Sequence, residues 1–525
     1  MRCVASAPAT VECRVHPGPG TRLHTAIVHG ADQSTVHEVD IPWHGTRRLA
    51  AMPRHPIHLT ASAAELRPIF AAIRDRLDVP GPFPTPVLED ATRAAATPVA
   101  HDLDMTDLPF VSIDPPGSMD LDQLLHLARR GPGFRVRYAI ADVGSFVTPG
   151  SPLDACVNER GVTHYGPDVR SPLHPPILSE QAASLLPEVV RPAMVWDIDL
   201  DSHGGIDDVR LRRAMVRSRA RLTYRQVADE LARGTAGDVL GLLPLIGQAR
   251  REVEADRGGV SLPLADQEVV ATGDGYRLDL RQPLPVEQDN AQLSLLTGIA
   301  AAQVMRAGRV GIQRTLPPAS AEVMATLRAT ALALHIDWPD DVGFHSLVRT
   351  LDPARPTHAA FLDESTVLFR GAGYRAFDGS RPPDAEHAGI AADYAHVTAP
   401  LRRLVDRHGL EVCHALATDQ PVPEWVTDQL YELPERMEVA TRRAANHERA
   451  VVDVIEAALV SDRIGDVFEA TVVDADDDGT GGTVMIAEPA VRSRIHGDGI
   501  RLGEVIEVRV ESATIDAGRI ELARV

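Results

Sequence analysis

Three aspartates within nine residues place the strongest constraint on how this chain can fold. They stand at positions 114, 120 and 122 of the segment Ser-Ile-Asp-Pro-Pro-Gly-Ser-Met-Asp-Leu-Asp-Gln that covers residues 112–123. If the chain is extended from Asp120 onward, Asp120 and Asp122 share one face of a strand, and the Pro-Pro-Gly turn can bring Asp114 back beside them. Carboxylates held this close repel one another unless a cation lies between them, and Mg²⁺ or Mn²⁺ prefers such all-oxygen ligands. The segment is therefore either a solvated acidic turn or a divalent-metal site of the kind that serves phosphoryl chemistry.

The 525 residues of the chain are too many for one compact core, and their patterning predicts several domains. Short β-type runs, followed by a helical pattern at 61–77 with a Ser62 cap and Glu65 three residues on, predict a small β-containing domain with one helix at 1–95. Strand-like segments around a Gly-Pro-Gly turn dominate residues 105–210. Helical periodicity dominates four later segments, 224–256, 290–307, 320–335 and 400–460. This order predicts an α+β multidomain protein with a mixed α/β body.

The last segment, residues 461–525, returns to short strands separated by Gly and Asp turns. About five strands of this size are typical of an OB-type β-barrel, a common oligonucleotide binder. The acidic run Asp474–Gly479 starts like a calcium-binding loop, but Met485 stands at the twelfth position where such a loop needs glutamate. We therefore expect this run to be the tip of a hairpin.

The formal net charge of −21 excludes a diffuse cationic surface. All 53 basic residues are arginine, so any polyanion has to be bound by localised arginines. The run 209–225 holds seven arginines and no acidic residue, and it includes Tyr224. Arginine interleaved with an aromatic residue suits single-stranded nucleic acid, although an exposed amphipathic segment would show the same pattern. By contrast, residues 464–525 carry 6 arginines against 13 acidic residues, which predicts a weak or mainly structural contact with a polyanion.

Four scattered cysteines without a C-x-x-C pair argue against a disulfide scaffold and are typical of a reducing cytoplasm. The sequence holds no apolar run near the roughly 20 residues that span a bilayer. The N-terminal stretch lacks the apolar core of a secretory signal. We therefore expect a cytoplasmic monomer that does not contact a membrane.

Several motifs in consistent order make the chain recognisable. Four segments together resemble the catalytic domain of the RNase II/RNase R family of 3′→5′ exoribonucleases. They are SIDPPGSMDLDQ, the stretch that runs from YAIADVGSFVTPG to EVVRPAM, GAGYRAFDG, and HAGIAADYAHVTAPLRRLVDRHG. The resemblance covers about residues 105–415. It implies an RNB-type catalytic domain at 96–415 with a helical extension at 416–460, followed by an OB-type RNA-binding domain at 461–525.

The resemblance implies that Asp114, Asp120 and Asp122 are metal ligands, with Asp120 and Asp122 also catalytic. The family has a fourth aspartate where this chain has Gln123, whose carbonyl oxygen can coordinate a metal but brings no charge. Arg402, in TAPLRRLVD, matches the arginine that contacts the phosphate of the reacting nucleotides, where a guanidinium can stabilise developing charge.

The resemblance also assigns residues that bind RNA. Tyr165 matches the tyrosine that stacks near the scissile 3′ end, Tyr224 matches a second tyrosine near the site, and Arg403 matches a basic position beside Arg402. The family's Glu-Glu pair that helps to select ribose has no clear counterpart, and three residues could fill its place: Glu287, Asn290 or Gln292. The dense arginine run adds three more candidates for RNA binding: Arg217, Arg219 and Arg221.

The resemblance thus implies a 3′→5′ exoribonuclease that hydrolyses single-stranded RNA processively from its 3′ end to nucleoside 5′-monophosphates, with Mg²⁺ or alternatively Mn²⁺ as cofactor. Gln123, an alanine at position 399 in place of the usual serine, and the acidic C-terminal segment leave a second reading open. In that reading the chain is a catalytically weak RNB-like RNA-binding protein. A third reading is that the chain is a nuclease that acts on DNA.

Overall fold

A computed structural model gives the structure of the chain. It describes residues 11–14, 25–28, 57–58, 62–97, 99–264, 266–271, 276–476, 479–486 and 491–525. The chain divides into two compact units, Met1–His55 and Pro56–Val525. In the first unit, strands β1 (Val11–Arg14) and β2 (Thr25–Val28) form an antiparallel pair. Most of the domain predicted at 1–95 lies outside the described residues, and its boundary stays a prediction.

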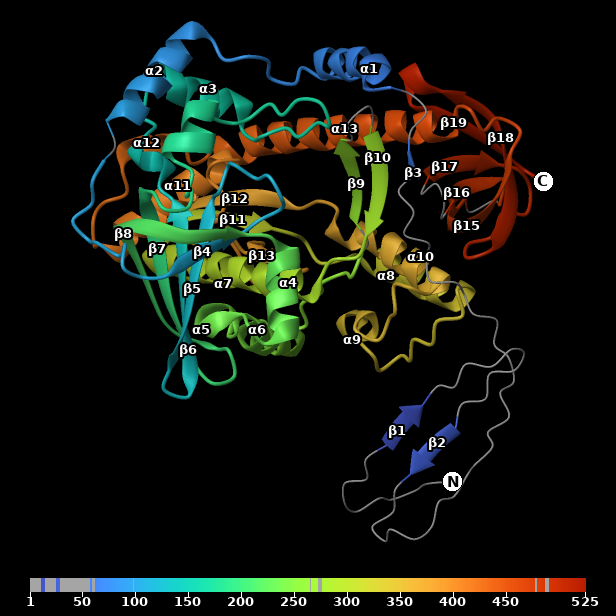
Figure 1. The fold of residues 1–525 in the computed structure, drawn as a ribbon, viewed down its shortest axis with the longest axis horizontal. Coiled ribbons are helices and arrows are strands. Elements are labelled where there is room, and N and C mark those ends of the chain that lie inside the picture. Colours follow the sequence, from blue (N-terminus) through green and yellow to red (C-terminus); the bar gives the residue numbers. More distant parts are fainter. Residues whose placement is uncertain are drawn as a thin grey trace. The chain divides into compact units, whose positions relative to one another are not determined.

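The second unit contains a closed barrel in the order β4-β5-β6-β7-β8, hereafter the first barrel, at the left in Figure 1. Its strands are β4 (Phe110–Ile113), β5 (Gln123–Arg130), β6 (Gly133–Ala141), β7 (Val190–Leu200) and β8 (Ile206–Leu222). Neighbouring strands are antiparallel, except that β4 and β8 close the barrel in parallel. The β4–β5 connection carries the three aspartates, so the barrel fixes both ends of the acidic segment.

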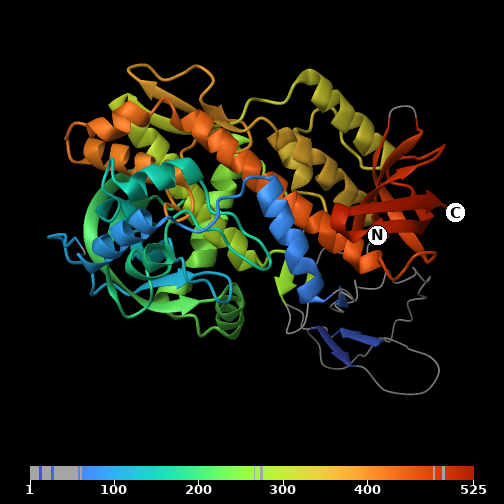
Figure 2. The ribbon, with the colours of Figure 1, turned by 90° about the horizontal axis from the view of Figure 1, so that it is seen from above.

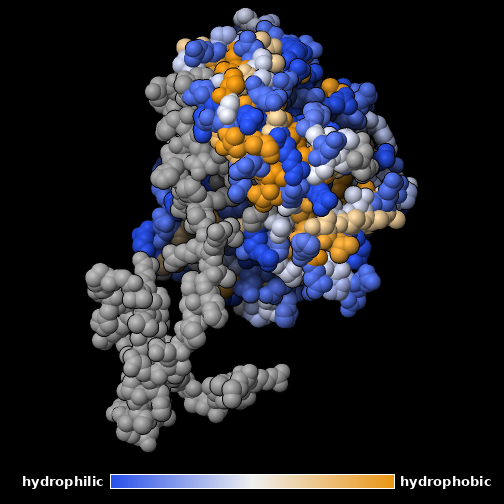
Figure 3. Space-filling view, turned by 90° about the vertical axis from the view of Figure 1, so that its right-hand side faces the viewer, coloured by the Kyte–Doolittle hydropathy of each residue, from blue (hydrophilic) through white to orange (hydrophobic). Residues whose placement is uncertain are grey.

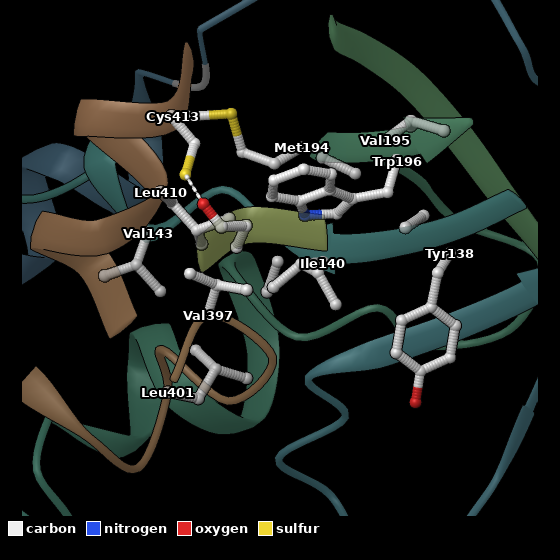
Figure 4. Packing of buried hydrophobic residues seen from close by; sticks show 14 of the residues in the cluster. Tyr138, Ile140, Val143, Met194, Val195, Trp196, Val397, Leu401, Leu410 and Cys413 are labelled. Atoms are coloured by element: carbon white, nitrogen blue, oxygen red, sulfur yellow. Dashed lines mark hydrogen bonds between the residues drawn. The ribbon is translucent and has the colours of Figure 1, made fainter. Parts of the chain in front are cut away.

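Large apolar side chains fill the first barrel, because alternate residues of each strand point inward. Trp196 on β7 and Ile140 on β6 are fully buried, and they pack toward Leu410 and Cys413 of helix α11 (Leu404–Ala417) (Figure 4). Helix α7 (Pro285–Gly308) also joins this core. Gly298 allows α7 to lie close to the Tyr394 ring, because a Cβ at this position would be 2.1 Å from that ring.

A second closed barrel follows, in the order β15-β16-β17-β19-β18, and confirms the predicted C-terminal OB-type barrel, while its boundary at residue 461 stays a prediction. Its strands are β15 (Val467–Ala475), β16 (Gly481–Ile486), β17 (Val491–His496), β18 (Val505–Thr514) and β19 (Arg519–Arg524). The acidic run lies at the β15–β16 hairpin, as predicted, although Asp477 and Asp478 fall outside the described residues. On the face shown in Figure 3, hydrophobic residues gather in small patches between hydrophilic ones.

Helix α13 (Leu433–Val460) links the two barrels (Figures 1 and 2). Its first half contributes Leu433, Met437 and Ala440 to the core of the first barrel. Its second half packs with helix α1 (Ala63–Arg76) into the core of the second barrel. One helix therefore belongs to both hydrophobic cores.

The remaining elements surround this frame. The helices are α2 (Thr85–Ala96), α3 (Pro152–Arg160), α4 (Tyr224–Arg233), α5 (Gly237–Leu240), α6 (Leu243–Arg257), α8 (Ala321–Ala333), α9 (Phe344–Val348), α10 (Pro356–Glu364) and α12 (Glu424–Gln429). The strands are β3 (Ile57–His58), β9 (Asp266–Ala271), β10 (Tyr276–Arg281), β11 (Val310–Thr315), β12 (Gly373–Asp378), β13 (Glu386–His387) and β14 (Ala392–Asp393). No helix in the described part of the chain has the length and apolar character needed to cross a bilayer.

A buried ion pair joins α11 to α3 and generates a stability prediction. Arg407 Nη1 lies 2.5 Å from Asp154 Oδ1, Nη2 donates to the Val147 carbonyl oxygen, and both charged side chains are at most 4% exposed. Arg407→Ala would leave the Asp154 carboxylate buried without its partner, so we expect a loss of about 3–5 kcal/mol in the free energy of unfolding. Urea unfolding followed by circular dichroism measures it.

The control is Arg442→Ala, which removes an exposed i,i+4 pair with Glu438 and should cost less than about 1 kcal/mol. If Arg407→Ala and Arg442→Ala lowered the free energy of unfolding equally, the buried pair would not be an important contribution to stability.

Candidate active site

Asp122 is the most buried of the three aspartates, with 4% of its surface exposed. Its Oδ1 accepts a hydrogen bond from the Leu401 N–H at 2.7 Å, and its Oδ2 lies 3.4 Å from Arg402 Nε. Burial raises the pKa of Asp122 to about 7, although Arg402 and the Leu401 N–H oppose the shift. Asp122 is thus a carboxylate that can hold or release a proton near neutral pH.

The loop 398–403 presents Arg402 to Asp122, and buried polar contacts fix its backbone. The Ala399 N–H donates to Asp406 Oδ1 at 2.7 Å, and Asp406 is fully buried. Arg403 binds both oxygens of Asp406 at 2.8 Å. The Arg403 guanidinium therefore holds the loop together, and its contact with RNA stays a prediction. Arg402 keeps a side chain that is 46% exposed, free to meet a ligand beside Asp122.

Asp114 and Asp120 lie beside Asp122. Burial raises the pKa of Asp114, and the charge of Asp120 adds to the rise for both Asp114 and Asp122. Asp114 Oδ2 is buried and accepts no hydrogen bond from the described residues. Asp120 Oδ1 lies 2.7 Å from Arg170 Nη1, and its Oδ2 is 3.4 Å from the Tyr165 hydroxyl. The folded chain thus brings together the three aspartates that the sequence singled out.

The donor set fits a divalent metal in its chemistry. It consists of carboxylate oxygens, which hard cations prefer, and it includes the unpartnered oxygen of Asp114. Within the described ranges, however, no three His, Cys, Asp or Glu side chains already converge as a ligand set. One oxygen of Asp120 instead faces Arg170, a residue that the sequence reasoning missed and that lies five positions after Tyr165.

Gln123 is bound on both sides of its amide. Its Nε2 donates to the Thr398 carbonyl oxygen at 2.7 Å, and its Oε1 accepts a hydrogen bond from the buried Tyr138 hydroxyl. The side chain therefore ties β5 to the loop that carries Arg402. Its role as a metal ligand stays a prediction. The sequence reasoning did not single out Tyr138, whose contact with Gln123 depends on the β5–β6 pairing.

The two tyrosines predicted to bind RNA lie at the edge of the site. Tyr165 is 52% exposed, which leaves its ring accessible. Tyr224 begins α4, and its hydroxyl accepts a hydrogen bond from Asn290 Nδ2 at 3.3 Å. Burial raises the pKa of Tyr224, and the charge of Asp114 raises it further. Of the three residues considered for the ribose-selecting position, Asn290 contacts Tyr224, while Glu287 pairs with Arg281 and Gln292 donates to Glu254.

The dense arginine run forms most of β8, and several of its charges are neutralised on the barrel exterior. Arg210 and Arg212 alternate onto the face where β7 presents Asp197 and Asp199. Arg212 pairs with Asp197, and Arg210 lies 3.6 Å from Asp199. Both aspartates are nearly fully buried under the arginines that surround them. This part of the run is therefore a structural ion-pair ladder and not a free basic track.

The end of the run that follows the ladder approaches the aspartates. Arg219 donates to the Thr106 carbonyl oxygen at 2.8 Å, and Arg221 donates to the Ser118 carbonyl oxygen at 2.6 Å, inside the acidic segment. Arg217 is half-buried on the same strand. Binding of RNA by Arg217, Arg219 and Arg221 stays a prediction, and Arg221 is the one whose contact lies within the site.

The fold and the site define a class of protein, namely an α+β chain with two β-barrels and a carboxylate–arginine centre suited to phosphate esters. The model of the RNB domain matches residues 103–417, and that of the RNase II-type exonuclease C-terminal S1 domain matches residues 466–525. The chain belongs to the RNB-domain family. The predicted family and fold class are thereby confirmed.

Two curated relatives illustrate the distance to known proteins. Ribonuclease R of Escherichia coli K12 is 27% identical over 474 residues, which cover 80% of this chain and 57% of the relative. Exoribonuclease 2 of Photorhabdus laumondii is 26% identical over 466 residues, covering 80% of this chain and 69% of the relative. The chain thus spans little more than half of Ribonuclease R.

Two solved structures share the fold. RNase R of Mycoplasma genitalium in complex with ribose-methylated single-stranded RNA has a TM-score of 0.77 at 20% identity, over 87% of this chain and 77% of that one. Yeast Ssd1, described as a pseudonuclease, has a TM-score of 0.63 at 16% identity, over 78% and 53% of the two chains. At these identities the likeness shows the fold alone.

A buried histidine under the Arg402 loop generates a pH prediction. His174 is 1% exposed, its Nδ1 lies 3.2 Å from the Leu401 carbonyl oxygen, and burial lowers its pKa to about 4. Because the unfolded imidazole has a pKa near 6.5, the unfolded state takes up the proton first, and stability present above pH 6.5 is lost as the pH falls toward 4. Between pH 7.5 and 5.5 the wild type should lose about 1 kcal/mol more than His174→Gln.

Urea unfolding at the two pH values measures this difference. His203→Gln, which replaces an exposed histidine between β7 and β8, should keep the pH dependence of the wild type. The same pH dependence in His174→Gln and the wild type would contradict the assignment.

Proposed function

We propose that this protein is a 3′→5′ exoribonuclease that hydrolyses single-stranded RNA processively to nucleoside 5′-monophosphates. The observation that carries the proposal is the placement of the buried Asp122 against a half-exposed arginine, Arg402, with Asp114 and Asp120 close by. Membership of the RNB-domain family and relatives named Ribonuclease R and Exoribonuclease 2 support it.

Asp114, Asp120 and Asp122 would hold the divalent cation, with the carbonyl oxygen of Gln123 as the predicted fourth ligand. Mg²⁺ is the ion we propose, with Mn²⁺ as the alternative. When bound, such a cation neutralises phosphate charge and lowers the pKa of water. Asp122 accepts the proton of the attacking water at Oδ2, the oxygen that the Leu401 N–H does not hold. Arg402 binds the scissile phosphate, where its charge stabilises the transition state.

The remaining residues position the RNA. Tyr165 stacks on the terminal base, a contact that every base can make, so the enzyme does not depend on sequence. Tyr224 and Asn290 contact the sugar–phosphate backbone next to Asp114. We keep the expectation of a cytoplasmic monomer as part of this proposal.

The proposal predicts that Asp122→Asn lowers the rate of RNA cleavage about 10³-fold, because the amide cannot take up the proton. Purified protein is incubated with a 5′-labelled oligoribonucleotide, single-stranded or with a 3′ overhang, in Mg²⁺ or Mn²⁺. The ladder of shortened products and the released nucleoside 5′-monophosphate are quantified, with an unlabelled RNA trap to test processivity.

The matched control is Asp208→Asn on the barrel exterior, where the carboxylate pairs with Arg210, and it should cleave within about twofold of the wild type. An active Asp122→Asn variant would refute the role of Asp122. A matched oligodeoxyribonucleotide tests for DNA cleavage.

A second prediction concerns Tyr165. Since stacking on an aromatic ring contributes about 1–3 kcal/mol per base, Tyr165→Ala should raise KM for a single-stranded substrate about tenfold, whereas Tyr165→Phe should stay near the wild type. Steady-state kinetics on the same oligoribonucleotide measures both. If Tyr165→Phe were as impaired as Tyr165→Ala, the hydroxyl contact with Asp120 would be the important one.

A catalytically weak RNA-binding protein is the second candidate. The observation that favours it is Gln123, whose amide is bound to Thr398 and Tyr138 where the resemblance implies a fourth acidic ligand. Yeast Ssd1, which shares the fold, is described as a pseudonuclease. RNA binding without a product ladder in either metal would support this candidate over the nuclease.

A further inference from the structure

Arg170 bridges two carboxylates at the mouth of the site. Its Nη1 lies 2.7 Å from Asp120 Oδ1, and its Nη2 contacts Glu180 Oε1. The side chain is 25% exposed, and that of Asp120 is 14% exposed. A planar guanidinium that binds two acids in this way is a specific contact rather than a loose surface pair.

The segment that carries Arg170 is itself anchored. Asp168, two residues earlier, pairs with Arg74 of α1 at 2.7 Å, and the Asp168 side chain is 4% exposed. Ser171, the next residue, exchanges two backbone hydrogen bonds of 2.9 Å with His164. The backbone is therefore anchored on both sides of Arg170, which keeps this residue next to Asp120.

The electrostatics of the site give this contact a function. Asp120 is a proposed metal ligand, and a guanidinium on one of its oxygens competes directly with a cation. In the structure Asp120 Oδ1 lies against the guanidinium of Arg170, so a cation that binds this oxygen has to replace that contact.

We infer that Arg170 is an internal counter-ion of Asp120 that a divalent metal must displace, so that Arg170 sets the metal concentration at which the site is loaded. Asp120 would then be available to hold the metal, and Arg170 would keep its second partner, Glu180. The inference rests on the proposed function, because it takes Asp120 as a metal ligand, and it names Arg170 as a positioning residue that acts through Asp120.

Mn²⁺ binding to the full chain, measured by calorimetry without RNA, tests the inference. Arg170→Gln removes the competing charge, so Kd for Mn²⁺ should fall about twofold to fivefold, the range expected for a partly exposed ion pair. Asp120→Asn should weaken binding, which locates the ion. An unchanged or higher Kd in Arg170→Gln overturns the inference.

Two controls separate displacement from a general change of charge. Arg221→Gln removes a charge near the same aspartates without breaking a carboxylate pair, and it should change Kd less than Arg170→Gln does. Arg135→Gln breaks a pair of similar exposure on the barrel exterior, with Asp199, and it should leave Kd unchanged. A shift in Arg221→Gln as large as in Arg170→Gln would overturn displacement.

Glu180→Gln gives a test that does not depend on folding of the Arg170 variant. Without its second partner the guanidinium stays on Asp120, so Kd should rise, and the rise should vanish when Arg170→Gln is also present. A Kd unchanged by Glu180→Gln overturns the inference, as does an absence of Mn²⁺ binding in all variants.

RNA cleavage is scored separately on the wild type. If the wild type cleaves RNA normally but Arg170→Gln leaves Kd for Mn²⁺ unchanged, only the inference about Arg170 is refuted, and the proposed nuclease activity stands. If Kd for Mn²⁺ changes among the variants as predicted but the wild type does not cleave RNA, only the proposed nuclease activity is refuted, and the inference about Arg170 stands.

Discussion

The hydrogen bond from the Leu401 N–H to Asp122 Oδ1 joins two segments that lie 279 positions apart in the chain. One segment is the β4–β5 connection of the first barrel, and the other is the loop that precedes α11. The site does not exist until both are in place, because neither holds the acids and the arginine together. The barrel, α7 and α11 therefore form a support for this one contact.

Charge balance is the second constraint on the site. Buried carboxylates are costly without a partner, and arginines meet two of those near the site in different ways. Arg402 lies against Asp122 but keeps an exposed side chain, whereas Arg403 is committed to the buried Asp406. Two adjacent arginines thus have different roles, one exposed beside Asp122 and one in a buried ion pair, and a count of basic residues could not distinguish them. The same division separates Arg212 in the barrel ladder from Arg221 at the acidic segment.

Much of the architecture could be predicted from the sequence, because local signals agreed with the tertiary fold. The Ser62–Glu65 capping box opens α1 as expected, and the alternating segments at the C-terminus form a closed barrel. The aspartates were found because acids so close together need an explanation. Arg170 and Tyr138 were missed because their roles come from contacts across the fold, with Asp120 and Gln123 respectively. The pairing of Arg212 with Asp197 depended on the β7–β8 register, which composition does not encode.

Gln123 has a consequence for how this chain can change over evolutionary time. Its amide donates to Thr398 and accepts from Tyr138, so both ends of the group are needed by the protein itself. An aspartate at this position is one methylene shorter and has no N–H, and it would leave the Thr398 carbonyl oxygen without its donor. An acid at position 123 would therefore also require a change at its neighbours, Thr398 and Tyr138.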